Sequence, residues 1–339
     1  MKLCRFIGLF ICIAAMNCSD KNVAQYQLWP KLEPYQTGYL KVSDIHEIYY
    51  QLGGNPQGKA VMVLHGGPGA GCSPDYFRYF NPQVYNIIMH DQRGAGESRP
   101  FAEIRENNTQ NLVEDIEKLR MHLKLEQVIL FGGSWGSTLA LAYAETYPQN
   151  VSGIVLRGVF TSTQAELDHY YHGAVAEYFP QDYQKLEALT DSSKKNYAAQ
   201  LLEKMTGPDT TLRDQCAKAW AVYEGKIAYL EVADSTVESW FADGWNPLAF
   251  SIIENYYMAN HCFLAEGQLL NNADKIADIP CIIINGRYDT ICPPITAYKL
   301  HQKLPRSRLV IVERAGHSAD EPGIQEQLVK AARDFEKGW

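Results

Sequence analysis

The sequence predicts an α/β fold in which a mostly parallel central sheet is interrupted by an inserted helical segment. Short apolar, β-branched runs alternate with helical patterns over residues 37–156, and the same alternation returns near residue 280. Residues 160–271 show no strand periodicity, read as helical and are rich in aromatic side chains. With 339 residues, 46% of them apolar, the chain can bury one large core together with a subdomain.

Charge and cysteine content narrow the class of ligand. A net charge of −8 without clusters of Lys or Arg argues against nucleic acid or an anionic membrane surface as the main partner and favours a neutral or cationic ligand. Three of the eight cysteines lie in the first 18 residues. The other five are widely spaced, which fits neither a disulfide framework nor a zinc site, although one pair can still form in an oxidising compartment.

The N-terminus has the pattern of an export signal. A basic start and an apolar run over residues 6–16 precede a small polar exit, and the run is too short to span a bilayer permanently. The four residues that end at Cys18 resemble a bacterial lipobox, whose cysteine is lipidated, but Asn17 departs from that pattern, so cleavage near Ala15 is the alternative. We therefore expect residues 1–18 to be a leader of an exported protein, either periplasmic or a lipoprotein anchored to the membrane through Cys18. The other interpretation is an uncleaved N-terminus on a cytoplasmic enzyme.

The first part of the sheet is expected within residues 26–159. After a surface arm over residues 26–35, period-2 alternation predicts an antiparallel start, and continuous apolar runs then predict strands that are covered on both faces. Four apolar residues at helical spacing predict a helix over residues 108–123. The predicted strands of this part are residues 37–42, 46–52, 59–64, 84–90 and 128–133.

The strand at 128–133 turns sharply into an Ala- and Leu-rich helix, with Ser134 at the turn. Gly132 and Gly136 complete a G-x-S-x-G pattern, the signature of a nucleophile elbow, in which small residues are required because the serine backbone is strained. The helix that begins near Trp135 directs backbone N–H groups toward the position of an oxyanion. We therefore expect Ser134 to be a nucleophile.

A second glycine cluster follows the strand at residues 59–64, in the run His65-Gly66-Gly67-Pro68-Gly69. Glycines after a buried strand let backbone N–H groups approach a ligand closely, as an oxyanion hole requires. We assign its two donors to the N–H groups of Gly67 and Trp135. A phosphate loop is disfavoured because no Gly-Lys-Ser/Thr follows.

The second part of the sheet is expected after a helical cap over residues 160–271, within residues 272–339. Asp289 follows one buried strand of this part and His317 follows the next. Both side chains should therefore lie at the carboxyl edge of the sheet beside Ser134, with His317 as the base and Asp289 orienting it. The remaining strands are predicted over residues 151–156, 280–285 and 308–312, and a closing helix over 324–335.

From about Tyr35 to Phe335 the chain resembles the proline iminopeptidases, serine peptidases of the α/β-hydrolase fold with an inserted helical cap. Two cap positions depart from that pattern, with Tyr223 where the family has Trp and Tyr256 where it has His. The resemblance is carried by His65-Gly66-Gly67-Pro68-Gly69, Asp91-Gln92-Arg93-Gly94, residues 132–143, Tyr223-Glu224-Gly225, residues 253–257, Gly286-Arg287-Tyr288-Asp289, Gly316-His317-Ser318 and residues 320–323.

The resemblance implies a serine exopeptidase that releases N-terminal proline from peptides through an acyl-enzyme. It also implies that Glu224 and Glu254 hold the imino cation of the substrate, while Phe160, Tyr170 and Cys292 line the pocket for the ring. It implies no cofactor and no metal, and His169-x-x-His172 lacks a third ligand.

Two other functions remain open from the sequence. The first is an esterase or amidase that uses the same triad, although neutral acyl substrates gain nothing from buried carboxylates. The second is a ligand-binding receptor that keeps the hydrolase fold but turns over slowly, since a fold does not determine function.

Overall fold

The computed structural model describes residues 26–339 apart from 192, 194–195 and 243–245. The leader expected over residues 1–18, including Cys18, lies outside the described residues. Within them, no helix combines the length and apolarity needed to cross a membrane. The five cysteines of the described part are free thiols.

Eight strands form one sheet in the order β1-β2-β4-β3-β5-β6-β7-β8. β2 pairs antiparallel with both β1 and β4, and every other neighbouring pair is parallel. All eight predicted strands are confirmed; β6 is longer than predicted, reaching Val159. The strands are β1 (Gln36–Lys41), β2 (Glu47–Gly54), β3 (Lys59–Leu64), β4 (Tyr85–His90), β5 (Val128–Ser134), β6 (Val151–Val159), β7 (Cys281–Gly286) and β8 (Ser307–Val312).

Two hydrophobic cores cover the two faces of this sheet, because alternate residues of each strand point to opposite faces. On β3, Met62 and Leu64 join one core, whereas Val61 and Val63 join the other. The first core takes in the helices α1 (Thr109–His122), α2 (Trp135–Thr146), α10 (Gln268–Asn271) and α11 (Pro294–Lys303), with η4 (Ala273–Ile276). The second takes in η1 (Pro74–Tyr79) and α12 (Pro322–Glu336). A short turn of 3-10 helix, η2 (Pro148–Asn150), leads into β6.

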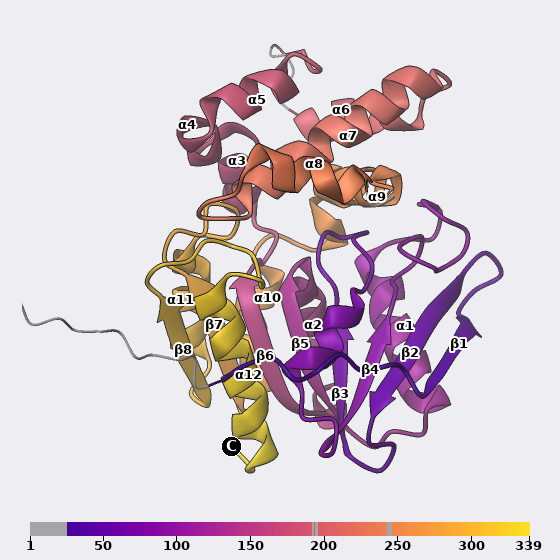
Figure 1. Cartoon of the computed structure of the whole chain (residues 1–339), viewed down its shortest axis with the longest axis vertical. Helices are drawn as coiled ribbons and strands as arrows, with labels where there is room; N and C mark the ends of the chain where they lie inside the picture. Colours follow the sequence, from indigo (N-terminus) through magenta and orange to yellow (C-terminus); the bar gives the residue numbers. More distant parts are fainter. Residues whose placement is uncertain (1–25, 192, 194–195, 243–245) are drawn as a thin grey trace, which may run out of the picture.

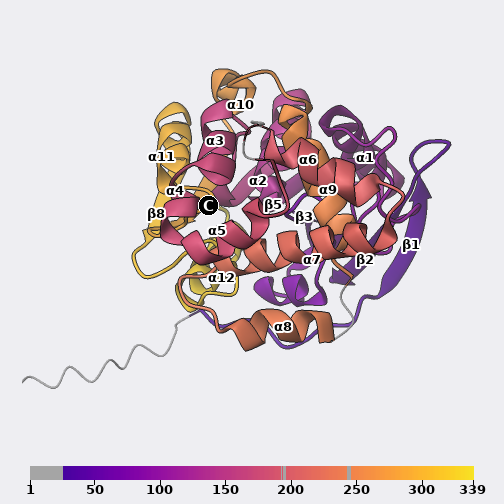
Figure 2. The same ribbon diagram turned by 90° about the horizontal axis from the view of Figure 1, so that it is seen from above.

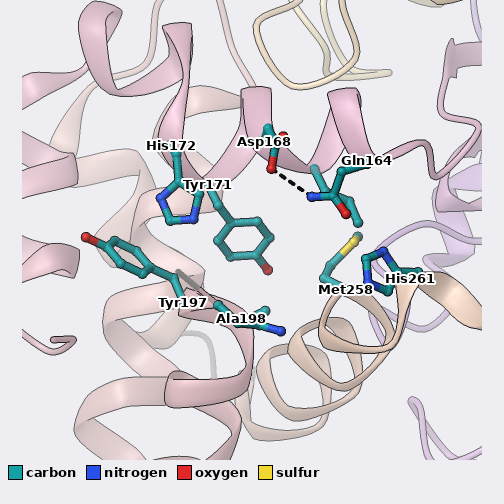
Figure 3. A pocket seen from close by; sticks show the side chains of 10 residues that line it. Gln164, Asp168, Tyr171, His172, Tyr197, Ala198, Met258 and His261 are labelled. Atoms are coloured by element: carbon teal, nitrogen blue, oxygen red, sulfur yellow. Dashed lines mark hydrogen bonds between the residues drawn. The ribbon is translucent and has the colours of Figure 1, made fainter. Parts of the chain in front are cut away.

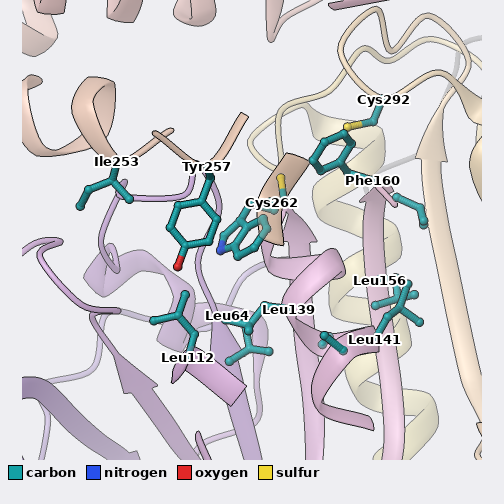
Figure 4. Close-up of a cluster of buried hydrophobic side chains, with 14 of the residues drawn as sticks. Leu64, Leu112, Leu139, Leu141, Leu156, Phe160, Ile253, Tyr257, Cys262 and Cys292 are labelled. Atoms are coloured by element: carbon teal, nitrogen blue, oxygen red, sulfur yellow. The ribbon is translucent and has the colours of Figure 1, made fainter. Parts of the chain in front are cut away.

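A helical cap lies over the carboxyl edge of the sheet (Figures 1 and 2). Between β6 and β7 the described residues contain helices and no strand. The larger core continues from the sheet into this cap (Figure 4), and the rings of Trp135 and Tyr257 join the two parts with centroids 4.8 Å apart. The cap helices are α3 (Gln164–His172), α4 (Ala174–Tyr178), α5 (Pro180–Glu187), α6 (Tyr197–Thr206), α7 (Thr210–Ile227), α8 (Asp234–Ala242) and α9 (Leu248–Ala259), followed by η3 (His261–Phe263).

Candidate active site

Ser134 lies at a strained turn between β5 and α2. Its φ of 57° and ψ of −129° are unusual for a residue with a side chain. The turn requires that the two flanking glycines have no side chain. A Cβ on Gly132 would overlap the carbonyl oxygen of Gly136, and a Cβ on Gly136 would overlap the carbonyl oxygen of Leu64. Close packing of the strand end against the helix start therefore holds the Ser134 backbone in this conformation.

The glycine loop after β3 lies beside Ser134. A Cβ on Gly66 would sit 3.4 Å from the Cβ of Ser134, and Gly67, with φ of 102°, lines the same cavity as Ser134. Gln92 fixes the start of this loop: its backbone N–H donates to His65 Nε2 at 2.9 Å, and its side-chain amide donates to the His65 carbonyl at 2.9 Å. The indole N–H of Trp135 donates to Gln92 Oε1 at 2.8 Å. Gln92 therefore hydrogen-bonds to both segments that carry the expected oxyanion donors, the loop of Gly67 and the helix start at Trp135.

Asp289 and His317 form the predicted pair. His317 Nδ1 lies 2.8 Å from Asp289 Oδ2, and Asp289 Oδ1 accepts the backbone N–H of Ile291 at 3.1 Å and of Cys292 at 2.7 Å. Gly158, at the end of β6 with φ of 55°, lies against this pair, and a Cβ there would come within 2.8 Å of the imidazole. The carboxylate is therefore fixed by backbone donors and aimed at the ring.

Arg157 is a site residue that the sequence analysis missed. Its Nη1 lies 2.9 Å from His317 Nε2 and donates to the His317 carbonyl at 3.0 Å. In the described part of the chain no hydrogen bond joins Ser134 Oγ to His317, so the expected contact between nucleophile and base is not formed in this structure. Such contacts commonly tighten only when substrate binds. The sequence contained a signal for Arg157, because a charged residue at the end of a buried strand requires a partner.

Burial lowers the pKa of His317, and the positive charge of Arg157 lowers it further, while Asp289 acts in the opposite direction. As the pH falls, the His317 imidazole therefore stays neutral to a lower pH than a free histidine does. A neutral imidazole is the form that can accept a proton from a serine hydroxyl.

An inner pocket next to Ser134 contains the other predicted residues. Gly67, Phe160, Tyr170, Glu224, Glu254 and Cys292 all line it, together with Glu166, Leu167, Met258 and Ile291. No lysine, arginine or histidine is among these described lining residues. The structure thus brings every predicted substrate-binding residue to one cavity with the nucleophile.

The two glutamates of the pocket are each held by one aromatic donor. The Tyr170 hydroxyl donates to Glu224, and Trp220 Nε1 donates to Glu254 Oε2 at 2.6 Å. Burial raises the pKa of Glu224 to about 7. Burial, with the charge of Glu224 next, raises the pKa of Glu254 well above its usual range. Two carboxyl groups in one pocket whose described walls hold no cation are costly to ionise together unless a cation joins them; the charge of Arg157, outside these walls, offsets only part of the rise for Glu224.

Glu166 also lines the pocket but is fully occupied by structural contacts. Its carboxylate accepts hydrogen bonds from Thr161, Thr163 and Thr296 and closes the capping box at the start of α3. Only Glu224 and Glu254 therefore have capacity left for a ligand.

The inner pocket is nearly closed, with about 20 Å³ of free space, roughly enough for one water. A bound ring needs more room, and unbranched Met258 is the wall residue that can move most cheaply. Leu167 and Met258 also line a larger cap cavity of about 610 Å³ between α3, α6 and α9 (Figure 3), which gives them space to move into.

The histidine pair of α3 does not form a metal site. His169 Nε2 lies 2.7 Å from the carbonyl of Thr290. Over the described ranges, no three His, Cys, Asp or Glu side chains are grouped so that they could hold a metal ion.

The strained serine, the Asp–His pair and the sheet order define the class of protein. The chain is an α/β hydrolase, and residues 59–321 match the family model described as the alpha/beta hydrolase fold. A solved esterase from Exiguobacterium antarcticum shares this fold with a TM-score of 0.62 at 22% identity, covering 88% of this chain and 98% of the esterase.

Sequence relatives narrow the class further. The chain is 45% identical to a probable proline iminopeptidase of Leptolyngbya boryana, covering 91% of this chain and 97% of that protein. It is 43% identical to a proline iminopeptidase of Arabidopsis thaliana, covering 92% of this chain and 83% of that protein. The chain belongs to the proline iminopeptidase family, and it is a serine exopeptidase of the α/β-hydrolase class.

Proposed function

We propose that this enzyme releases proline from the N-terminus of peptides, with Ser134, His317 and Asp289 as its catalytic triad. The observation that carries the proposal is the pair Glu224 and Glu254 in a pocket that also contains Ser134 and no basic residue among its described walls. A substrate with a cationic N-terminus supplies the missing charge. Anchoring that cation next to the nucleophile restricts cleavage to the first peptide bond.

The proposed reaction begins when Ser134 Oγ attacks the prolyl carbonyl carbon and His317 Nε2 takes the hydroxyl proton. For this step Arg157 must release Nε2. The backbone N–H groups of Gly67 and Trp135 stabilise the tetrahedral oxyanion, and His317 then gives its proton to the leaving amine. Water hydrolyses the resulting ester by the same route, which frees proline and Ser134.

Phe160, Tyr170 and Cys292 supply the apolar contact for the pyrrolidine ring. The esterase alternative is less well supported, because a neutral acyl group leaves both glutamates without a counterion. The fold likeness to an esterase shows the fold alone.

The test compares prolyl 7-amido-4-methylcoumarin with its N-acetylated form and with p-nitrophenyl acetate. We expect rapid hydrolysis of the free prolyl amide and a loss of at least about a hundredfold on acetylation, since the cation is removed. Faster hydrolysis of the acetylated amide, or activity confined to the ester, would refute the proposal.

We also propose that the protein is exported, on the basis of the leader pattern that ends at Cys18. Fractionation of cells that express the full chain, with Cys18→Ser as the comparison, tests this. Membrane-bound wild type with a released variant supports a lipoprotein, whereas wild type in the cytoplasm refutes export.

A further inference from the structure

A second cavity, of about 560 Å³, lies on the imidazole side of the site. Arg157 and His317 line this outer cavity, whereas Ser134 lines only the inner pocket. Among the described lining residues, Glu224 alone belongs to both cavities. The two cavities therefore meet at Glu224 and flank the reacting groups, and the size of the outer one is typical of ligand sites.

The position of the outer cavity determines which part of a substrate it can receive. In acyl transfer the imidazole protonates the leaving amine, so the leaving group must lie on the His317 side while the acyl group lies with Ser134. We propose that the outer cavity binds the leaving peptide and selects a basic side chain at the residue directly after the scissile bond. This inference rests on the proposed function and extends it to the other half of the substrate.

Aromatic rings from three separate segments form the walls of this cavity. Tyr76 comes from η1, Tyr229 follows α7, and Trp240 comes from α8, with the Tyr229 and Trp240 centroids 6.2 Å apart. Such rings can pack against the aliphatic stem of lysine or arginine, and their faces attract the terminal cation.

Carboxylates occur on the exposed side of the same cavity. Asp75 and Asp320 both line it and both are exposed. Asp75 pairs with Arg78 at 3.1 Å, and Asp320 accepts the Tyr229 hydroxyl at 3.2 Å, so each keeps acceptor capacity. Arg157 is the one lysine or arginine among the described lining residues, but it is 8% exposed and engaged with His317. Arg78 offsets part of the Asp75 charge but does not line the cavity, so the accessible charge of the described lining residues is negative.

The experiment measures kcat/KM for proline release from amidated tripeptides Pro-Xaa-Gly. Lysine and norleucine at Xaa compare the same stem with and without its charge, and glutamate and glutamine compare the opposite sign. We expect about a two- to fivefold preference for lysine over norleucine, since exposed ion pairs contribute modestly. Asp75→Asn combined with Asp320→Asn should bring that ratio close to one, and Asp75→Lys should favour the glutamate peptide.

Asp278→Asn is the matched control, because Asp278 is an exposed carboxylate before β7, at the opposite edge of the sheet. It should leave both the lysine preference and the hydrolysis of prolyl methylcoumarylamide unchanged. Equal rates for lysine and norleucine, or a preference that survives the double substitution, would overturn this inference while leaving proline release intact. Failure to release proline from any substrate would refute the proposed function and this inference together.

Discussion

Replacing Glu224 by glutamine should make the free enzyme more stable at pH 8 while making it a poorer peptidase. Burial raises the pKa of Glu224 to about 7, so at pH 8 folding confines an anion beside Glu254 in a pocket whose described walls include no cation. An amide removes that charge and can still accept the hydrogen bond from Tyr170. The charge that we propose to bind substrate thus destabilises the empty enzyme.

The magnitude follows from the pKa displacement. A rise from 4.5 to about 7 corresponds to at most about 3.4 kcal/mol of unfolding free energy. Glu224 is only half-buried, so solvent screens part of this, and we expect about 1–2 kcal/mol, or about 1.5–3 °C in Tm. Between pH 4.5 and 7 the native protein holds the proton more tightly than the unfolded chain, so wild-type stability falls as pH rises through that window. The gain from Glu224→Gln should be full above about pH 7 and absent below about pH 4.5.

Thermal denaturation at pH 4.5, 6 and 8 tests this, together with kcat/KM on the prolyl methylcoumarylamide. The same substitution should lower kcat/KM by about thirtyfold or more, because the substrate cation loses one buried partner. Glu166→Gln is the contrasting control: Glu166 lines the same pocket but accepts three threonine hydroxyls, so its amide variant should lose stability. A lower Tm for Glu224→Gln at pH 8 would show that the free enzyme already neutralises this carboxylate.

Three further results are expected. Ser134→Ala should reduce kcat by about a thousandfold or more, while calorimetry should still detect proline binding. If the variant kept a tenth of the activity, Ser134 would not be the nucleophile. Arg157→Gln should raise the pKa of His317, so the acidic limb of the kcat/KM profile, which reports the free enzyme, should move to higher pH; an unmoved limb would contradict the observed contact. A thiol reagent should inhibit slowly, because burial raises the pKa of Cys292, and Cys292→Ala should resist it; equal inhibition of both would place the sensitive thiol elsewhere.

The fold and the elbow were predictable because their signals are local. The periodicity of each strand, the glycines around Ser134 and the positions of Asp289 and His317 just after strands are all short-range features of the sequence. Parallel pairing then brings the ends of β5, β7 and β8 to one edge of the sheet. Sequence order and sheet geometry were sufficient for these parts.

The electrostatics of the site were not predictable, because they depend on contacts between distant segments. Arg157 meets His317 across 160 positions of sequence, and Trp220 meets Glu254 across 34. Neither Arg157 nor Trp220 lies in a recognised motif, and the charge of a residue does not by itself show which residue it will contact. The resemblance pointed to the pocket glutamates, whereas their raised pKa values could be derived only from the packing around them.

The last turn of α7 shows why specificity and catalysis depend on the same helix. Glu224 lies in that turn, and the carbonyl of Ala228, directly after α7, accepts the backbone N–H groups of His317 at 3.0 Å and of Ser318 at 2.8 Å. One helix end therefore carries the glutamate that we propose to bind substrate and also holds the loop of the proposed base, His317. Because only four residues separate these two positions, any displacement of this end of α7 is transmitted to the His317 loop. The proposed reaction needs Nε2 to exchange Arg157 for Ser134, and the end of α7 is the element through which binding at Glu224 can act on that exchange.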